Sequence, residues 1–341
     1  MANHLLKFLF ILVFSIMITL GIIYLVGVEK IMKEIMKMDL ILFLLASLSY
    51  LIVNIVMALR IKYVLEKLNE KPTLKDCFKS NMFGMLLSDI TIARTGYFGT
   101  AIDLSAKTGI ALEKTFVAIF LPQMIDFIIK VLSSVILINL VIINLGLLSN
   151  EQLFSFTLLS LFFLLLFFSI LTIMLEKSMI EKLSFLAKIP ILNKFYVLAK
   201  LVVEYSALLK LHVFKVSSFT IIAWLFKGLE WYFLALAFGI NIFGIFDFFF
   251  FLLFQPLVTF SHFLPIPTVG GTGLSEGVVG LILNAFGISL EIAIAYGFMT
   301  RFLTLLVNLL FGVNRLLEII IMNEFTKMLE SINNIIKKTQ K

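Results

Sequence analysis

The sequence has 341 residues, of which 61% are hydrophobic and 14% are charged, and its mean hydropathy is +1.10. A soluble protein of this length cannot bury so much apolar surface, so the composition indicates a protein that crosses a membrane several times. The apolar runs approach or exceed the roughly 20 residues that a helix needs to cross a bilayer, and they lack the alternation of barrel strands. The sequence therefore predicts an all-α, polytopic transmembrane helical bundle.

The net charge of +7 comes from lysines beside apolar runs, which is typical of cytoplasmic loops and contacts with anionic lipids rather than of nucleic-acid binding. The single cysteine, Cys77, excludes a disulfide framework within the chain. Three scattered histidines do not indicate a metal site. We expect no cofactor, no metal and no nucleic acid as partner. The apolar run in residues 1–27 is longer than a signal-peptide core and lacks a cleavage site, so we expect a retained first helix.

One integral membrane domain is predicted over residues 1–341, with its main spans at 5–26, 40–59, 111–148, 154–175, 216–238, 243–263 and 292–321. Residues 60–79 carry six basic and three acidic residues, which places this loop and the N-terminus on the cytoplasmic side of the cell membrane. In residues 176–215, apolar side chains recur every three or four residues. This region is expected to be a cytoplasmic amphipathic connector, either at the lipid interface or packed on the bundle.

Two further segments are expected to be broken or re-entrant. Residues 80–109 are short and polar for a span, and they are either a polar loop or a broken segment facing protein or a water-filled cavity. Residues 265–288 begin with Pro-Ile-Pro-Thr-Val-Gly-Gly-Thr-Gly-Leu-Ser-Glu, and such a run of prolines and glycines cannot form a regular helix. Whether the second segment crosses the membrane decides the side on which the Lys-rich C-terminal tail lies, and both alternatives are open.

The run 111–148 is almost twice as long as a bilayer is thick, so we expect a kink or break near Pro122. Asp126 and Lys130 lie one helical turn apart in it, and they form either an internal ion pair or a contact to a substrate. Lys227 and Glu230 are a second pair of opposite charges inside an apolar run.

A weak internal repeat links the two halves. Residues 109–113 read Gly-Ile-Ala-Leu-Glu and residues 287–291 read Gly-Ile-Ser-Leu-Glu, and the same offset aligns Gln123 with Arg301. A broken segment followed by a helix with a polar residue, present in both halves, is the pattern of transporters at their substrate site. A true repeat and a chance match in an Ile- and Leu-rich chain are both open.

The glycine-rich break is chemically suited to an anion. A half-helix beginning near Leu274 presents unpaired N–H groups and a positive dipole end, and the glycines before it let a ligand approach the backbone. Glu276 is a cap of this helix, a partner of Arg301 or a proton carrier. Arg301 is either that partner or a ligand of a headgroup phosphate, which a guanidinium grips with two hydrogen bonds.

These residues resemble a flippase-like family related to the transmembrane region of lysylphosphatidylglycerol synthase. That family carries Pro-x-Pro-Gly-Gly-x-Gly-x-x-Glu before its last helices, similar to residues 265–276, and an arginine in the next helix, as at Arg301. Its first half has Arg-x-Gly-acid, Thr-Gly and Glu-Arg-x-x-Asp. The matching residues in this sequence are Arg94-Thr95-Gly96, Thr108-Gly109 and Asp126. Tyr97 replaces the usual acid, and Pro122 and Gln123 replace the usual Glu and Arg.

The resemblance implies a lipid translocase that binds a polar or charged headgroup, anionic or phosphate-bearing, in an intramembrane cavity. In the synthase, such a membrane region moves a lipid that a separate soluble domain makes, and we expect no such domain in these residues. The residues predicted to bind the headgroup are Arg94, Gly96, Gln123, Asp126, Gly270, Gly271, Gly273, Glu276 and Arg301. Two alternatives are an enzyme that transfers a group to or from a lipid, with Glu276 or Asp126 as acid or base, and a non-catalytic partner of a separate lipid-modifying enzyme.

Overall fold

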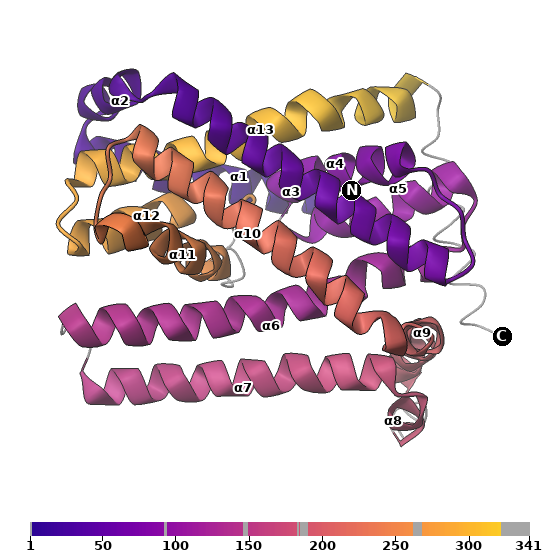
Figure 1. Ribbon diagram of the computed structural model, residues 1–341. Coiled ribbons are helices and arrows are strands. Elements are labelled where there is room, and N and C mark those ends of the chain that lie inside the picture. The colour runs from indigo at the N-terminus through magenta and orange to yellow at the C-terminus, as the bar shows by residue number, and fades with distance from the viewer. Residues whose placement is uncertain are drawn as a thin grey trace. The chain divides into compact units, whose positions relative to one another are not determined.

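The computed structural model describes residues 2–91, 94–145, 149–182, 184, 190–261 and 268–321. Regular structure in these residues is helical (Figure 1), which confirms the predicted all-α class. The elements are α1 (Ala2–Val26), α2 (Val28–Lys37), α3 (Leu40–Lys67), α4 (Leu74–Ile90), η1 (Thr95–Phe98), α5 (Gly99–Thr108), α6 (Leu112–Leu145), α7 (Asn150–Leu175), α8 (Lys177–Lys182), α9 (Pro190–Ala207), η3 (Lys210–His212), α10 (Val213–Ala237), η4 (Gly244–Phe246), α11 (Asp247–Ser261), α12 (Leu274–Ala285) and α13 (Leu290–Ile321). Pro265, Pro267 and the Lys-rich tail lie outside the described residues.

Five of the described helices are long and apolar enough to cross a membrane. They cover residues 40–67, 112–139, 157–175, 210–237 and 290–319. Helices α1 and α2 meet at 83° around Gly27 and would add a sixth span if the bent pair counts as one. Large apolar side chains on α7, among them Leu158, Phe162 and Leu165, are exposed, and a lipid bilayer is the solvent that suits them. These helices form a polytopic bundle.

The chain divides into two compact units. Unit 1 contains residues 1–53, 84–97 and 224–310, and unit 2 contains residues 54–83, 98–223 and 311–341. Helices α3, α4, α10 and α13 contribute residues to both units. Unit 1 contains the break that follows α4 and the glycine-rich break before α12, so the candidate site belongs to this unit.

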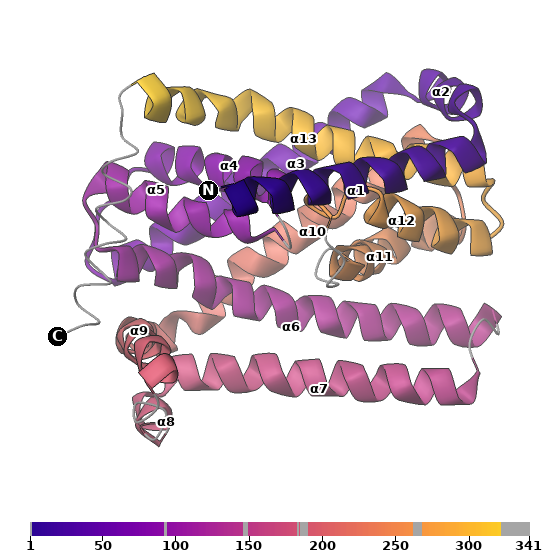
Figure 2. The same cartoon turned by 180° about the vertical axis from the view of Figure 1, so that it is seen from behind.

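In unit 2, the long helices α6 and α7 run side by side (Figures 1 and 2), and α9 packs against both. The break expected near Pro122 is absent, because α6 continues through this proline as one helix of 34 residues. Proline removes one hydrogen bond from the helix, but the buried side chains of Ile119, Leu121 and Met124 pack on both sides of it. This packing holds the helix together across the missing bond.

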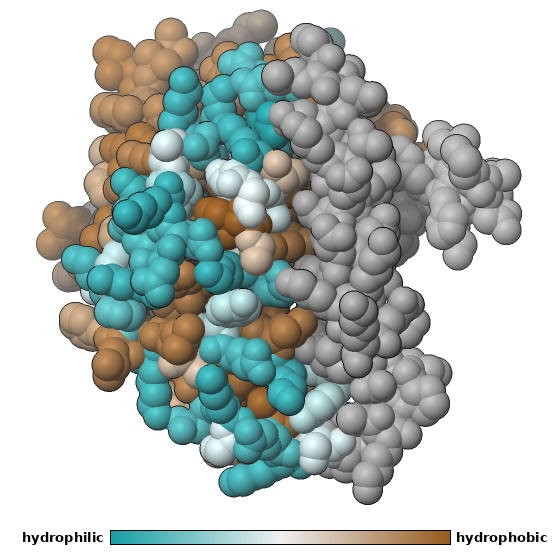
Figure 3. Space-filling model, turned by 90° about the vertical axis from the view of Figure 1, so that its right-hand side faces the viewer, coloured by the Kyte–Doolittle hydropathy of each residue, from teal (hydrophilic) through white to brown (hydrophobic). Residues whose placement is uncertain are grey.

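Charged side chains in unit 2 gather near the first turn of α6. Lys114 pairs with Glu70 at 2.5 Å, and Lys107 pairs with Asp76 at 2.7 Å. Figure 3 looks onto the end of unit 2 where α5 and α9 lie, and hydrophilic residues cover much of that face. An end rich in lysine is typical of the cytoplasmic side of a membrane protein.

In unit 1, α11 and α12 lie side by side (Figures 1 and 2) and are short apolar helices of 15 and 12 residues. The segment 80–109 is a broken helix rather than a polar loop, because α4 continues to Ile90 and α5 begins at Gly99. The second break precedes α12. Each of the two breaks therefore stands directly beside a helix terminus, where backbone groups are available for other contacts.

Candidate functional site

The two breaks touch each other at Gly270. Its N–H donates a hydrogen bond of 3.1 Å to the carbonyl of Thr91, the residue that follows α4. Gly270 has a φ of 53°, and a Cβ at this position would lie 2.3 Å from the carbonyl oxygen of Asp89. Only glycine fits such a contact without displacing the backbone. The glycine-rich break is thereby fixed against the C-terminal end of α4.

The first break is a tight turn that places Arg94. The N–H of Gly96 donates to Oγ1 of Thr91 at 2.7 Å, and a Cβ on Gly96 would lie 2.4 Å from the backbone of Leu87. Arg94 itself has a φ of 56°, which is unusual for a residue with a side chain. Its Nη2 lies 3.2 Å from Oδ1 of Asp89, so the turn folds the guanidinium back onto the end of α4.

Glu276 holds the second break together. Its Oε2 accepts hydrogen bonds from the N–H of Gly273 at 2.8 Å and from Oγ of Ser275 at 2.9 Å, and its side chain is 1% exposed. The N–H of Gly273 is at the N-cap of α12, where a carboxylate also interacts favourably with the helix dipole. Gly271 and Gly273 both have left-handed φ values, of 79° and 83°. Glu276 is thus the cap of α12.

Arg301 of α13 reaches the same break from the opposite side. Its Nη1 donates to the carbonyl of Gly270 at 3.0 Å, and its Nη2 donates to the carbonyl of Val269 at 3.3 Å. Its Nε lies 3.7 Å from Oε1 of Glu276. The carboxylate therefore caps α12 and pairs with Arg301 at once, so two of the roles considered for it coincide.

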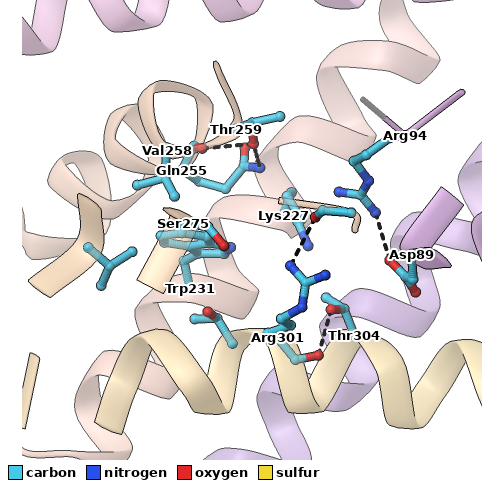
Figure 4. A pocket seen from close by; sticks show the side chains of 13 residues that line it. Asp89, Arg94, Lys227, Trp231, Gln255, Val258, Thr259, Ser275, Arg301 and Thr304 are labelled. Atoms are coloured by element: carbon cyan, nitrogen blue, oxygen red, sulfur yellow. Dashed lines mark hydrogen bonds and ion pairs between the residues drawn. The ribbon is translucent and has the colours of Figure 1, made fainter. Parts of the chain in front are cut away.

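These groups surround a cavity of about 60 Å³ in unit 1 (Figure 4). Arg94, Lys227 and Arg301 point toward this space from the first break, α10 and α13, and Asp89 lies beside Arg94. The remaining lining side chains include Trp231, Gln255, Val258, Thr259, Ser275, Val279, Thr300 and Thr304. Three cations and one carboxylate line the cavity, and the rest of its wall mixes hydroxyl, amide and apolar groups.

A buried polar network lies behind the cavity. Asn308 donates to Oδ2 of Asp89 at 2.7 Å and accepts from the hydroxyl of Tyr50 at 3.0 Å. Nζ of Lys227 lies 4.3 Å from the centroid of the Tyr50 ring and 2.8 Å from Oε1 of Glu230. Each cation of the cavity therefore has a carboxylate neighbour, because Arg94 is next to Asp89, Lys227 next to Glu230, and Arg301 next to Glu276.

Of the nine residues that the sequence suggested for the site, seven lie in or contact the two breaks, and three of these, Arg94, Gly270 and Arg301, line the cavity. All seven belong to unit 1, and they are Arg94, Gly96, Gly270, Gly271, Gly273, Glu276 and Arg301. The other two, Gln123 and Asp126, belong to unit 2, where Gln123 donates to Asp126 at 3.2 Å and Asp126 pairs with Lys130 at 2.7 Å. These two form a local cluster on α6 and are not among the described residues that line the cavity.

Sequence reasoning missed several residues of the site. Asp89 and Lys227 line the cavity, and Tyr50, Glu230 and Asn308 support them. A signal for one pair was available, because Lys227 and Glu230 are charges three residues apart within an apolar run. Tyr50 and Asn308 carry no comparable signal, since a single tyrosine or asparagine in an apolar helix has many uses.

Residues 10–312 match the family model of the lysylphosphatidylglycerol synthase transmembrane region. The chain belongs to this family, and with its apolar helices it is a multi-pass membrane protein. Comparison with curated proteins gave no match, and comparison with solved structures gave none either. The match covers both breaks and α1 to most of α13, so the cavity of unit 1 lies within the region that the family shares.

Proposed function

We propose that this protein binds the phosphate-bearing headgroup of a membrane lipid in the cavity of unit 1 and moves that lipid across the cell membrane. The observation that carries the proposal is the convergence of Arg94, Lys227 and Arg301 on one cavity. Charges at membrane depth are costly, and a protein retains three cations around one space most readily when they serve an anion. Membership in a family named for a lipid synthase supports a lipid as that anion.

The donor chemistry suits a phosphate. A guanidinium has five N–H donors, and Arg301 directs one hydrogen bond from each of Nη1 and Nη2 at the carbonyls of Gly270 and Val269. Donors therefore remain that can bind phosphate oxygens, and a planar guanidinium matches two of these oxygens at once. Arg94 supplies a second guanidinium to the same space. Arg94 and Arg301 together can donate hydrogen bonds to one phosphate from two directions.

The size of the cavity limits what enters it. A buried water needs about 10–15 Å³ of cavity volume. The cavity of about 60 Å³ therefore has room for about four waters or a single phosphate-sized group. A complete lipid headgroup with its acyl chains is larger. We infer that the cavity recognises the phosphate, while the acyl chains stay in the bilayer. Non-helical backbone at membrane depth is also tolerated where it lines a polar cavity, as both breaks do.

The test replaces the arginine that contacts the glycine-rich break. Vesicles with reconstituted protein and fluorescent phosphatidylglycerol report the movement of lipid between leaflets. We expect Arg301→Ala to lower the rate at least about tenfold, because a lost charge-assisted hydrogen bond to phosphate costs about 1.5–3 kcal/mol. Arg301→Lys keeps the positive charge but lacks the planar guanidinium, so its rate of lipid movement should lie between those of the wild type and Arg301→Ala. Thermal unfolding of each variant separates a binding defect from misfolding.

Lys210→Ala is the matched control, because Lys210 is an exposed cation of unit 2 that pairs with Glu176. It should translocate lipid at the wild-type rate. Unchanged transport by a folded Arg301→Ala protein would contradict the role assigned to the cavity. Mass spectrometry of the recovered lipid tests the enzymatic alternative, which requires a change in lipid mass that simple translocation does not produce.

A further inference from the structure

The geometry points to Glu230 as a proton acceptor that is loaded when a lipid phosphate enters the cavity, so that one proton accompanies each lipid anion. This inference rests on the function proposed above and adds a coupling to it. Glu230 lies on α10 one turn after Lys227 and is 0% exposed. Lys227 itself lines the cavity, so the carboxylate stands directly behind a cation that the ligand would meet.

The first step of the argument is charge balance. With all six groups ionised, the three cations of the cavity and their three carboxylate neighbours sum to zero. A phosphodiester brings one negative charge into this balanced and poorly solvated site. An uncompensated charge in such surroundings is strongly unfavourable, and the usual response is protonation of an acidic group. Uptake of one proton by one carboxylate restores the balance.

The second step is the choice among the three carboxylates. Asp89 accepts hydrogen bonds from Arg94 and Asn308, which come from two different segments. Glu276 accepts from Gly273 and Ser275 and caps α12. When a phosphate attracts Arg94, Asp89 therefore keeps the Asn308 donor, and Glu276 keeps the N–H of Gly273, because neither donor lines the cavity. Their negative charge remains stabilised by these contacts.

Glu230 is held differently. In the part of the chain that the structure describes, its hydrogen bond and its ion pair both come from Lys227, at 2.8 and 2.7 Å. Its Oε2 is buried without a hydrogen-bond donor in good geometry. A phosphate that attracts the Lys227 ammonium therefore weakens the one ion pair that stabilises this charge. Glu230 is the carboxylate that loses most on ligand binding.

The surroundings of Glu230 supply no further compensating cation on its own helix. The charged or titratable groups that face it electrostatically are Lys227 on α10, Tyr50 on α3, Arg94 in the first break and Tyr296 on α13. The two tyrosines are neutral at physiological pH, and Arg94 is paired with Asp89. The step itself is a proton transfer from water to a carboxylate oxygen of Glu230, and the proton leaves again when the lipid departs.

The test measures protons and lipid together. Purified protein in nanodiscs of phosphatidylcholine is titrated with short-chain phosphatidylglycerol in weakly buffered solution that contains a pH indicator. We expect uptake of about one proton per bound lipid. The apparent dissociation constant should rise about tenfold for each unit of pH across the neutral range, because one coupled proton gives this slope. The phosphodiester keeps a constant charge there, so the slope reports the protein.

Glu230→Gln should bind the probe without proton uptake and with an affinity that hardly depends on pH, whereas Glu230→Asp should restore uptake. Glu291→Gln is the matched control, because Glu291 belongs to the same unit but pairs with exposed Lys30 near the surface. It should behave as the wild type. If the Glu230 variants do not fold, the wild-type stoichiometry and an infrared band of a newly protonated carboxylic acid decide the question.

The outcomes separate the two proposals. Failure of wild-type protein to bind phosphatidylglycerol would contradict the proposed function itself. Binding without proton uptake would overturn only the coupling, and so would undiminished uptake by Glu230→Gln. Release of a proton on binding would also overturn it, because that sign indicates a cation such as Lys227 that loses its charge.

Discussion

A single glycine shows how closely the two breaks fit. Gly270 combines a left-handed φ with a contact that leaves no room for a side chain, since a Cβ would lie 2.3 Å from Asp89 and 2.8 Å from Nη2 of Arg301. Both neighbours belong to the charged lining of the cavity. A side chain at this position would therefore disturb the break and the charges at the same time.

Gly270→Ala tests this fit, and Gly239→Ala is its control. Gly239 also has a positive φ, of 66°, but nothing lies within 4 Å of the Cβ that alanine would add. The left-handed conformation costs an alanine about 1–2 kcal/mol at either site. We expect Gly270→Ala to lower the free energy of unfolding by at least about 1 kcal/mol more than Gly239→Ala does. Denaturant titration in detergent measures both losses. Equal losses would show that the contact with Asp89 does not restrict residue 270.

At the scale of elements, the short sequence match corresponds to the same local structure in both halves. Helix α5 ends at left-handed Gly109 with a φ of 73°, and Gly287, with a φ of 83°, follows the end of α12. Each glycine precedes a long helix, α6 or α13, whose second residue is a glutamate. The local geometry supports a repeat of this motif. The polar residue eleven positions after the start of each long helix is not shared, because it is Gln123 in α6 and Arg301 in α13.

A second arginine of α13 ties three elements of unit 2 together. Nε and Nη2 of Arg315 both lie 2.9 Å from Oδ1 of Asp103 on α5, and Ser80 of α4 donates to Oδ2 at 2.6 Å. Arg315 is 2% exposed and Asp103 is 0% exposed. No motif in the sequence pointed to Arg315. Its burial and its partners indicate that it anchors the half-helix α5 to α13.

Removal of one partner of this pair should be costly. We expect Arg315→Met or Asp103→Leu to lower the free energy of unfolding by about 3–5 kcal/mol, because each removes one partner of a buried ion pair. The double variant should lose less than the sum of the two. Lys62→Met is the control, since its partly exposed pair with Glu66 in the same unit should contribute less than about 1 kcal/mol. Additive losses in a double-mutant cycle would contradict a direct interaction.

For the whole molecule, the orientation in the membrane is a prediction that the distribution of lysine supports. Glu70 pairs with Lys114 at the start of α6, whereas Glu151 is the second residue of α7, which follows the other end of α6 in the chain. At 1.5 Å per residue, α6 is about 50 Å long, so the two ends lie on opposite sides of a bilayer if α6 crosses it. The lysine-rich end should face the cytoplasm.

Cysteine labelling tests this orientation. We expect a membrane-impermeant maleimide added outside intact cells to label Glu151→Cys, and to label Lys71→Cys only after the membrane is permeabilised. The wild type is the background control, because Cys77 is buried and burial raises the pKa of its thiol to about 12, which leaves little reactive thiolate. The reverse pattern would invert the topology. Labelling of both sites from outside would contradict a span at α6.

Local signals in the sequence were sufficient for much of this description. Hydropathy identified a membrane protein and its apolar helices, because transfer of a helix into lipid depends on its own composition. Proline and glycine located the break before α12, because their backbone restrictions act within a few residues. Seven of the nine residues suggested for the site belong to unit 1 of the structure. A break does not occur at Pro122, because α6 continues through this proline and buried side chains pack on both sides of it.

The sequence by itself determined that the protein lies in a lipid bilayer, that it is helical, and that a glycine-rich break precedes α12. Only the tertiary structure decided which charges meet. The contact between Thr91 and Gly270, the bond between Asp89 and Asn308, and the position of Lys227 over Tyr50 each join residues far apart in the chain. Burial makes each charge depend on its partners, and the folded arrangement sets those partners. The tertiary structure places the glycine-rich stretch beside a cavity on which the cations of three elements converge.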